Sequence, residues 1–456
     1  MKRCYSVIAL FIGTTLHAAS LPSIESQLIV PILPIVGIAN PKESQPLNKT
    51  HLNLNDAILL AVQRHPSITQ AVAQISQQQA NIRAAQAGYL PALTGTIQVG
   101  DLTSSQRGRQ IYSLKASQLL YDFGKVKTNV DIQQAKTILE QANALISVDD
   151  IAQTTSRTVL AIQHYQHLVD IAQEQLNGMQ HLYEIAELRA NAGISSRADP
   201  VQAQSYVDYA KSYLITQQSN LRQNQQRLNV LLGFDVSHTQ FEVSDRLLEH
   251  SGFYDDVPLN EVPKLVSAKA EMDVATAQKQ QAKTGVYPTI ALTGTFNQAV
   301  NGRNPNTVEK NGHDTAVYLT LNTNLYQGGA IKAQTQAADF AEQAAQAKLS
   351  ANYLELIETT RNAHEVIDHT QQQIWVLVDK QKVTAKTREL YEDQYKLGHR
   401  TILDLLSAEQ SYHSARAEKE QALYSIYDTL AQYIATTGKT RTVYDLNNKN
   451  IQGLNP

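Results

Sequence analysis

The feature that most constrains this chain is an internal duplication, in which one pattern of residues occurs twice in the same order. The tetrapeptide Leu-Thr-Gly-Thr occupies residues 93–96 and again residues 292–295. Beyond it, a constant separation of 205 residues relates the two halves. The pairs are Gly124 and Gly329, Gly193 and Gly398, Asp199 and Asp404, and Gly233 and Gly438. A register held over roughly a hundred residues predicts two copies of one structural unit.

Each copy is predicted to contain the same short elements. It begins with a helix rich in alanine and glutamine, over residues 54–88 and 263–285. Two segments with period-two alternation follow, near 93–99 and 112–116 and then near 290–297 and 317–325. Such segments have the length of tilted membrane-spanning strands, although a soluble hairpin with one buried face fits the pattern equally well. The polar stretches 100–110 and 299–315 are the predicted loops between the strands.

The longest predicted elements are two helices over residues 125–192 and 330–397. The first contains no proline and only one glycine, Gly178, and the second contains neither residue type. At about 1.5 Å per residue, each helix is a rod of about 100 Å, too long for the core of an ordinary globular domain. Gly193 and Gly398 are predicted to end these rods, and a returning helix then runs to Gly233 or Gly438.

The first residues are typical of a secretory signal peptide. Lys2 and Arg3 precede a mostly apolar run over residues 7–16, and Ala18 and Ala19 offer a cleavage site, so residues 1–19 are predicted to be removed. The apolar run is too short to span a membrane. The only cysteine, Cys4, lies inside this segment, and a mature chain without thiols is compatible with an oxidising compartment.

Composition and motifs argue against several classes of function. A net charge of −3 provides no strong basic field, so no nucleic-acid partner is expected. The chain has no Gly-x-x-x-x-Gly-Lys-Ser/Thr phosphate-binding loop, no His-Glu-x-x-His and no Gly-x-Ser-x-Gly. His164 with His167, and His364 with His369, have helical spacings that metal ligands use, but surface helix positions are the preferred interpretation. We expect no enzyme activity, no cofactor and no metal site.

Four predicted strands cannot close a membrane barrel, because known barrels contain at least eight. Unpaired strand edges inside lipid are prohibitively costly, since no water is present to satisfy their backbone groups. If these strands span a membrane, several copies of the chain must pool them, which predicts an oligomer. The alternative function, supported by the long helices alone, is a structural periplasmic coiled coil or an adhesin-like stalk.

Three kinds of segment resemble those of the TolC family of outer-membrane efflux and secretion channels. The residues Leu-Asn-Asp-Ala at 54–57 resemble the opening helix of the family. Its strand-to-helix motif is similar to residues 325–329, with Tyr326, Gly328 and Gly329, and less closely to residues 120–124, with Tyr121 and Gly124. Residues 398–406 resemble its helix-tip motif. The resemblance extends over residues 54–439, and the order and duplication of the motifs make it specific.

This resemblance implies an α+β membrane protein, a homotrimer in which twelve strands form one outer-membrane β-barrel that continues into a periplasmic barrel of twelve helices. The implied segments are the signal peptide (1–19), an N-terminal extension (20–52), a first repeat (53–233), an equatorial linker (234–262), a second repeat (263–438) and a tail (439–456). The implied partners are outer-membrane lipid, a periplasmic adaptor protein and an inner-membrane transporter of the ABC, RND or MFS class. Transport through such a channel is passive.

The candidate functional residues lie at the tips of the long helices. Ser196 with Asp199, and Thr401 with Asp404, fit the capping-box pattern, so each carboxylate could simply stabilise a helix start. The resemblance implies a different role, in which bridges between helices close the tunnel at the periplasmic tip. The implied bridge residues are Asp199, Tyr395 and Arg400, and Asp404 belongs to an acidic ring. Ser407 stands where the family carries a second acidic ring, which argues against a strong divalent-cation block.

Overall fold

The computed structural model describes residues 50–100, 109–244, 246–304, 306–447 and 449–454, all within one unit that spans Gln45–Pro456. The predicted signal peptide, most of the predicted N-terminal extension and most of the predicted loop at 100–110 lie outside the described residues. Within those ranges, no helix combines the length and the apolar character needed to cross a membrane.

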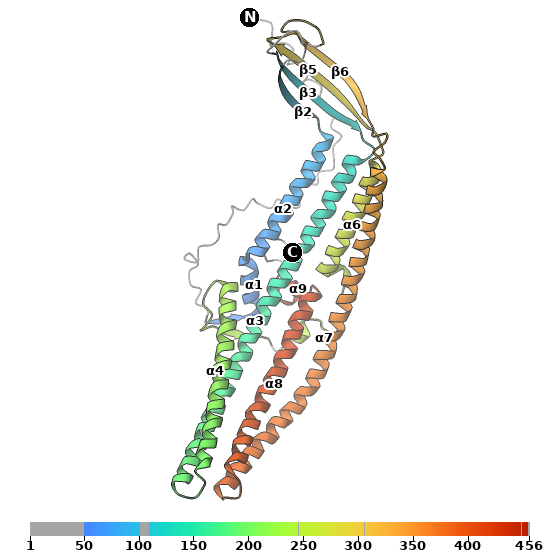
Figure 1. Ribbon diagram of the computed structural model, residues 1–456. Helices are drawn as coiled ribbons and strands as arrows, with labels where there is room; N and C mark the ends of the chain where they lie inside the picture. The colour runs from blue at the N-terminus through green and yellow to red at the C-terminus, as the bar shows by residue number, and fades with distance from the viewer. Residues whose placement is uncertain (1–49, 101–108, 245, 305, 448, 455–456) are drawn as a thin grey trace. The chain divides into compact units, whose positions relative to one another are not determined.

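The first half begins with two consecutive helices, α1 (Leu54–Arg64) and α2 (Pro66–Gln86) (Figure 1). The single helix predicted over 54–88 is therefore wrong at His65. A proline disfavours helical backbone in the residue before it, and His65 is extended, with φ of −69° and ψ of 127°. The His65 ring then caps α2, because its Nδ1 accepts a hydrogen bond of 3.2 Å from the Ser67 amide.

Four strands form one antiparallel sheet in the order β2-β3-β5-β6. They are β2 (Ala92–Gly100), β3 (Arg109–Tyr121), β5 (Thr289–Val300) and β6 (His313–Asn322). The shared tetrapeptide lies in the first strand of each hairpin, where Leu93 lies opposite Ala116 and Leu292 lies opposite Leu319. Because β2 and β6 are the outer strands of the sheet, each pairs on one side only within the described residues.

The second hairpin departs from the prediction at both ends of β6. The strand starts at His313, inside the predicted loop 299–315, and stops at Asn322 instead of continuing to residue 325. Asn322 pairs with Thr289, the first residue of β5. Pro288 precedes Thr289 and has no N–H group, so it cannot extend the hydrogen bonding between β5 and β6.

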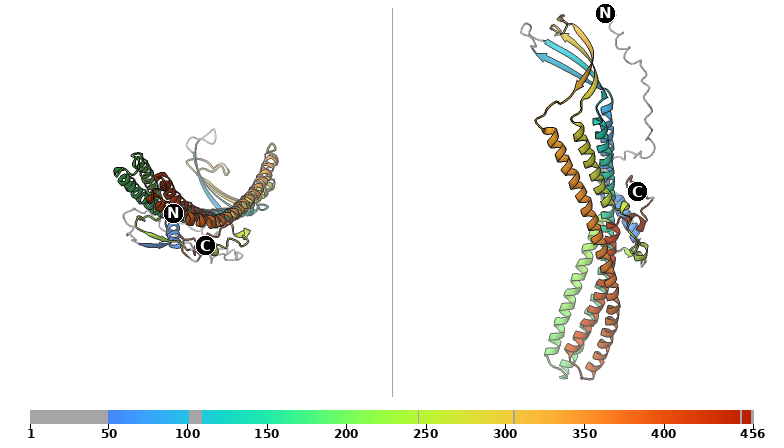
Figure 2. Two further views of the ribbon diagram at one scale, coloured as in Figure 1. Left: turned by 90° about the horizontal axis from the view of Figure 1, so that it is seen from below. Right: turned by 90° about the vertical axis from the view of Figure 1, so that its right-hand side faces the viewer.

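Two helices of 67 residues, α3 (Lys125–Asn191) and α7 (Ala330–Lys396), continue from the sheet, so the predicted rods are confirmed to within one residue at their ends. The returning helices α4 (Ala198–Leu232) and α8 (Ile402–Thr436) have 35 residues each. The helices lie side by side in one layer. In the half nearer the sheet their order is α2, α3, α6 (Pro263–Thr284), α7, and in the other half it is α4, α3, α8, α7 (Figure 1). Seen end-on, these helices lie along an arc (Figure 2).

A belt of short elements packs against the middle of the helices. It contains β4 (Gln240–Glu242), α5 (Leu247–His250), η2 (Leu259–Glu261) and α9 (Thr440–Val443). It also contains β1 (His51–Asn53), which pairs in parallel with β4 although the sequence interpretation left it in the N-terminal extension. Tyr433 of α8 anchors the belt, because its buried hydroxyl donates to the Phe253 carbonyl at 3.1 Å.

Candidate functional site

The two long helices end in the same kind of turn. Gly193 and Gly398 both adopt left-handed backbone, with φ of 72° and 80°. In the first turn the Ile194 amide donates to the Arg189 carbonyl, and in the second the His399 amide donates to the Gln394 carbonyl, each at 2.9 Å. These are Schellman turns, which favour glycine because it has no side chain to strain this conformation.

The helices that return from these turns start differently. At α8, Thr401 and Asp404 form a capping box, in which the Asp404 amide donates to Thr401 Oγ1 (3.2 Å) and the Thr401 amide donates to Asp404 Oδ2 (3.3 Å). At α4 the capping residue is Arg197, whose side chain makes no capping hydrogen bond. The predicted box between Ser196 and Asp199 does not form, although the Ser196 hydroxyl accepts a hydrogen bond from the Ala198 amide at 3.2 Å. The backbone is already helical at Arg197, so the Asp199 amide bonds to the Ser196 carbonyl (3.1 Å) instead of its hydroxyl.

Tyr395, in the last turn of α7, lies in a buried apolar cluster at the helix tips. Only 4% of the residue is exposed. Its cluster is built from α3, α4 and α8 and includes Leu182, Ala186, Ala203, Leu405 and Leu406. The phenol ring therefore joins the α3–α4 tip to the α7–α8 tip within one chain.

Charged side chains from α3 and α4 lie close to Tyr395. The Arg189 guanidinium is 4.8 Å from the centroid of the Tyr395 ring, and its Nη1 donates to the Tyr395 carbonyl at 3.3 Å. Burial raises the pKa of the Tyr395 hydroxyl, the positive charge of Arg189 lowers it, and the negative charge of Asp199 raises it. Asp199 thus lies near enough to act on Tyr395 by its charge, without a hydrogen bond between the two in the described residues, and Arg189 is the residue in direct contact with Tyr395.

Sequence interpretation missed Arg189 because no motif marks it. Its one signal is positional, since it stands four residues before the tip glycine, as Gln394 does before Gly398. Within the described residues, Arg189 Nε, Ser195 Oγ and Tyr395 Oη are buried without a hydrogen-bond partner. An unpaired buried polar group costs about 1–3 kcal/mol, so a further partner at this tip would be stabilising.

Arg400 belongs to a separate group at the α7–α8 turn. Its Nε donates to Gln394 Oε1 (3.0 Å), its guanidinium lies 4.3 Å from the centroid of the Tyr391 ring, and its Nη1 is 3.8 Å from Asp404 Oδ2. Arg400 and Asp404 are thereby brought together. In the part of the chain that is described, no hydrogen bond or ion pair joins Arg400 to Asp199 or Tyr395. Ser407 is exposed on α8.

The histidines contribute to packing. His164 is buried, so the expected surface position is wrong; its ring stacks on Tyr424, with centroids 4.6 Å apart, and its Nε2 lies 3.1 Å from Gln421 Oε1. The ring of His364 stacks on Phe253 at 4.2 Å. Across the described ranges, no group of three or more His, Cys, Asp or Glu side chains is arranged to hold a metal ion.

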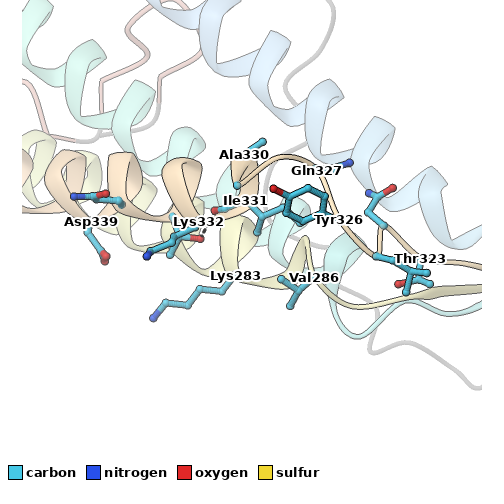
Figure 3. Close-up of a pocket in the computed structure, with 14 residues that line it drawn as sticks. Lys283, Val286, Thr323, Tyr326, Gln327, Ala330, Ile331, Lys332 and Asp339 are labelled. Carbon is cyan, nitrogen blue, oxygen red and sulfur yellow. Dashed lines mark hydrogen bonds between the residues drawn. The ribbon is translucent and has the colours of Figure 1, made fainter.

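The strand-to-helix junctions of the two halves differ in how they are closed. At the first, Tyr121 ends β3, and the Asp122 carboxylate accepts hydrogen bonds from the Gly124 and Val126 amides, at 2.9 and 2.6 Å. At the second, Gly328 and Gly329 have positive φ, as Phe123 and Gly124 do at the first, but no aspartate precedes them. An open pocket of about 1000 Å³ remains there, and Tyr326 is 85% exposed on its wall (Figure 3).

Comparison with known proteins gives one family and a consistent set of relatives. The family model described as "Outer membrane efflux protein" matches residues 57–234 and 258–439. Nodulation protein T of Rhizobium leguminosarum bv. trifolii is 24% identical over 380 residues, covering 79% of this chain and 80% of that protein. Outer membrane protein TolC of Escherichia coli (strain K12) is 21% identical over 332 residues, covering 69% and 66%. The crystal structure of the Campylobacter jejuni CmeC outer membrane channel has a TM-score of 0.73 and 15% identity, and the alignment covers 84% of this chain and 85% of that one.

Proposed function

This chain belongs to the outer membrane efflux protein family, and we propose that it is the exit channel of a tripartite efflux pump or a type I secretion system. The protein resides in the outer membrane and extends into the periplasm. In this proposal the channel is a passive conduit. An inner-membrane transporter of the ABC, RND or MFS class supplies the energy, and a periplasmic adaptor couples that transporter to the helix tips.

The observation that carries the proposal is that a four-stranded sheet with two unpaired edges continues directly into helices of 67 residues. At about 1.5 Å per residue, each long helix reaches about 100 Å away from the sheet. Backbone groups at β2 and β6 need partners inside lipid, where no water replaces them. Three copies would supply twelve strands and close the sheet, and their helices would line one tunnel.

The channel must stay closed until it is engaged, and we assign this role to the helix tips. Asp199, Tyr395, Arg400 and Asp404 form the proposed latch. No hydrogen bond or ion pair among the described residues joins Asp199 or Tyr395 to the pair Arg400 and Asp404, and the Tyr395 hydroxyl, which has no hydrogen-bond partner in these residues, has capacity for a bond to a neighbouring helix. Bonds of about 1 kcal/mol suit such a latch, because a few of them hold it and docking can break them.

Conductance of purified channels in planar bilayers tests the latch. Arg400→Ala combined with Asp199→Ala should raise the open fraction by an order of magnitude or more, because symmetry repeats each lost bond. The matched control is Ser196→Ala, which removes the hydroxyl that accepts the Ala198 amide at the start of α4 and leaves the four proposed latch residues in place. Wild-type conductance in the double variant would show that the tip carboxylates only stabilise helix starts.

Labelling of intact cells tests the topology. In a Cys4→Ser background, single cysteines between the strands of each hairpin, within residues 101–108 and 301–312, should react with an impermeant maleimide. Cysteines beside Gly193 or Gly398 should stay unlabelled until the outer membrane is permeabilised. The reverse pattern would overturn the proposed orientation. Migration that changes on heating would further distinguish a detergent-stable barrel from a periplasmic stalk.

A further inference from the structure

The first two helices meet at a break where one backbone hydrogen bond cannot form. α1 ends at Arg64 and α2 starts at Pro66. In a continuous helix the Val62 carbonyl would accept a hydrogen bond from the N–H group four residues later, but that residue is Pro66, which has none. Val62 is fully buried, so solvent does not replace the donor. A buried carbonyl without a partner destabilises the fold, so this break needs a donor from elsewhere in the chain.

The donor is Gln452, which lies 390 positions from Val62 in the sequence. Its Nε2 group donates to the carbonyls of Val62 and His65, at 3.0 and 3.2 Å. Its Oε1 atom accepts a hydrogen bond from the Thr69 hydroxyl. A glutamine amide has two N–H donors and one carbonyl acceptor, and both sides of this amide are used at the break. One side chain therefore bonds to the last turn of α1, to the residue between the helices and to the first turn of α2.

This glutamine belongs to a short segment, residues 450–454, which we call the strap. The Gln63 side chain of α1 donates to the Asn450 carbonyl at 3.3 Å. Ile451 is 1% exposed and belongs to the main apolar core. Leu454 packs against a small apolar cluster that is built from α2 and α3. The strap is thus held to α1, α2 and α3, on both sides of the break.

The backbone of the strap is unfavourable for glutamine. Gln452 and Gly453 have positive φ, of 51° and 90°, and lie between Ile451 and Leu454, which form an antiparallel bridge. Tight turns with two such residues favour asparagine or glycine at the first position, because longer side chains strain left-handed backbone. The hydrogen bonds of the Gln452 side chain at the break offset this strain.

The second repeat has an equivalent proline but no equivalent break. Pro263 starts α6, and Val262 before it is extended, with φ of −73° and ψ of 110°, as His65 is before Pro66. The residues before Val262 form the three-residue η2 instead of an α-helix, so this proline interrupts no α-helical hydrogen bonding. The break that the strap covers is therefore particular to the first repeat.

We propose that the break between α1 and α2 is a hinge and that the strap keeps it closed, with Gln452 in place of the N–H group that Pro66 lacks. α2 leads through η1 (Ala87–Tyr89) into β2, so the hinge sets the direction of the helix that carries this outer strand. When the strap is released, residues 62–69 open locally while the long helices α3 and α7 stay folded.

Amide hydrogen exchange of the purified protein, followed by mass spectrometry, tests the strap. Gln452→Gly removes the side chain and also relieves the left-handed backbone at this position. The amides of His65 and Ile68 form hydrogen bonds beside the break. We expect peptides that contain them to exchange roughly tenfold faster, because the variant loses the bonds to Val62 and His65. Gln452→Met keeps a side chain of similar length without the amide and should give the same result.

The matched control is Asp445→Gly. Asp445 also has positive φ, of 54°, but it is exposed and lies outside the strap, so exchange at the break should not change. Faster exchange confined to residues 62–69 in both Gln452 variants supports the strap. Unchanged exchange in these variants would overturn it, because the side chain would then not hold the break. Equal acceleration along α7 and α8, or acceleration at the break in Asp445→Gly, would also overturn it, since either result would indicate a loss of overall stability.

Discussion

The two long helices have the same length and equivalent places in the two halves, yet they lie in different surroundings. Twenty-four residues of α3 are buried, against five of α7. Since both helices have 67 residues, the difference reflects their neighbours: α3 is packed on both sides and α7 on one. Trp375, Val376 and Val383 of α7 are 77%, 68% and 64% exposed. Within the described residues, one chain therefore completes the packing of its first long helix and leaves one side of its second open.

The side chains at equivalent positions show the same contrast. Asp149 of α3 is 5% exposed, and its counterpart Leu354 of α7 is 65% exposed. Gly178 packs against the buried Glu409, and its counterpart Val383 faces outward. Asp149 and Gly178 of α3 thus contact other parts of the chain, while their apolar counterparts Leu354 and Val383 of α7 are exposed. Burial in α3 is thus matched to particular neighbours, and substitutions there should act through those neighbours.

The largest expected effect comes from giving α3 the residue that α7 carries, with Gly178→Val. A Cβ atom at this position would overlap the Glu409 carboxylate, which His413 (3.0 Å) and Arg388 (3.5 Å) hold in place. Displacing a buried, paired carboxylate should lower the free energy of unfolding by about 3 kcal/mol. Urea unfolding, followed by the circular dichroism signal of the helices, measures this free energy. Val383→Ala in α7 is the control and should lower the free energy of unfolding by about 1 kcal/mol or less. Equal losses in the two variants would mean that the two positions are equally constrained by their neighbours.

A second, smaller effect should depend on pH. Burial raises the pKa of the Asp149 carboxyl to about 7. The folded chain therefore holds a proton there that the unfolded chain releases near pH 4, and the free energy of unfolding falls as pH rises between about 4 and 7. Asp149→Asn mimics the neutral acid, so it should raise the free energy of unfolding by about 2 kcal/mol at pH 8 and change it little at pH 4.

Asp379→Asn on the exposed side of α7 is the control for this pH effect, because it removes a carboxylate that is not buried. Its unfolding curves should keep the pH dependence of the unmodified protein. If Asp149→Asn is less stable than the unmodified protein at pH 8, the charged form of Asp149 makes a favourable interaction that outweighs its burial.

The third effect compares the helix starts at the two tips. Thr401→Ala removes the hydroxyl that accepts the Asp404 amide, and we expect a loss of about 1 kcal/mol in the free energy of unfolding. Ser196→Ala should cost less, because it removes only the bond from the Ala198 amide to the Ser196 hydroxyl (3.2 Å) and keeps the bond from the Asp199 amide to the Ser196 carbonyl. Thermal melts of the two variants under the same conditions provide the comparison, and a larger shift for Ser196→Ala would reverse our assignment of the caps.

The smallest effect concerns the ion pair between His167 of α3 and Glu420 of α8. The hydrogen bond that His167 Nδ1 donates to the Glu420 carboxylate raises the pKa of His167, so the stability it contributes is present below about pH 6.5 and is lost as pH rises through the raised pKa. The His167 side chain is 62% exposed, so Glu420→Gln should cost less than about 0.5 kcal/mol at pH 5.5 and nothing measurable at pH 9. A cost that is the same at both pH values would indicate packing instead of charge.

Local sequence was sufficient for the parts of the fold that depend on neighbours in the chain. The absence of proline over 125–192 and 330–397 predicted the two rods, and alternation predicted strands near the observed hairpins. Two local predictions are wrong, the uninterrupted helix through His65 and the capping box at Ser196. Proline at position 66 restricts His65, and a helical Arg197 removes the capping box from Ser196. Both effects act over only a few residues, so they too are encoded in the local sequence.

The sequence by itself determined the lengths of the long helices and the glycines at their ends, because these follow from backbone preferences that act over a few residues. Only the tertiary structure decided which residues meet. The contact of Arg189 with Tyr395 joins residues 206 positions apart, and the pairing of β1 with β4 joins the two ends of the first half. The burial of His164 against Tyr424 likewise depends on how α3 lies on α8. Such contacts depend on the relative placement of whole elements, which no local pattern encodes.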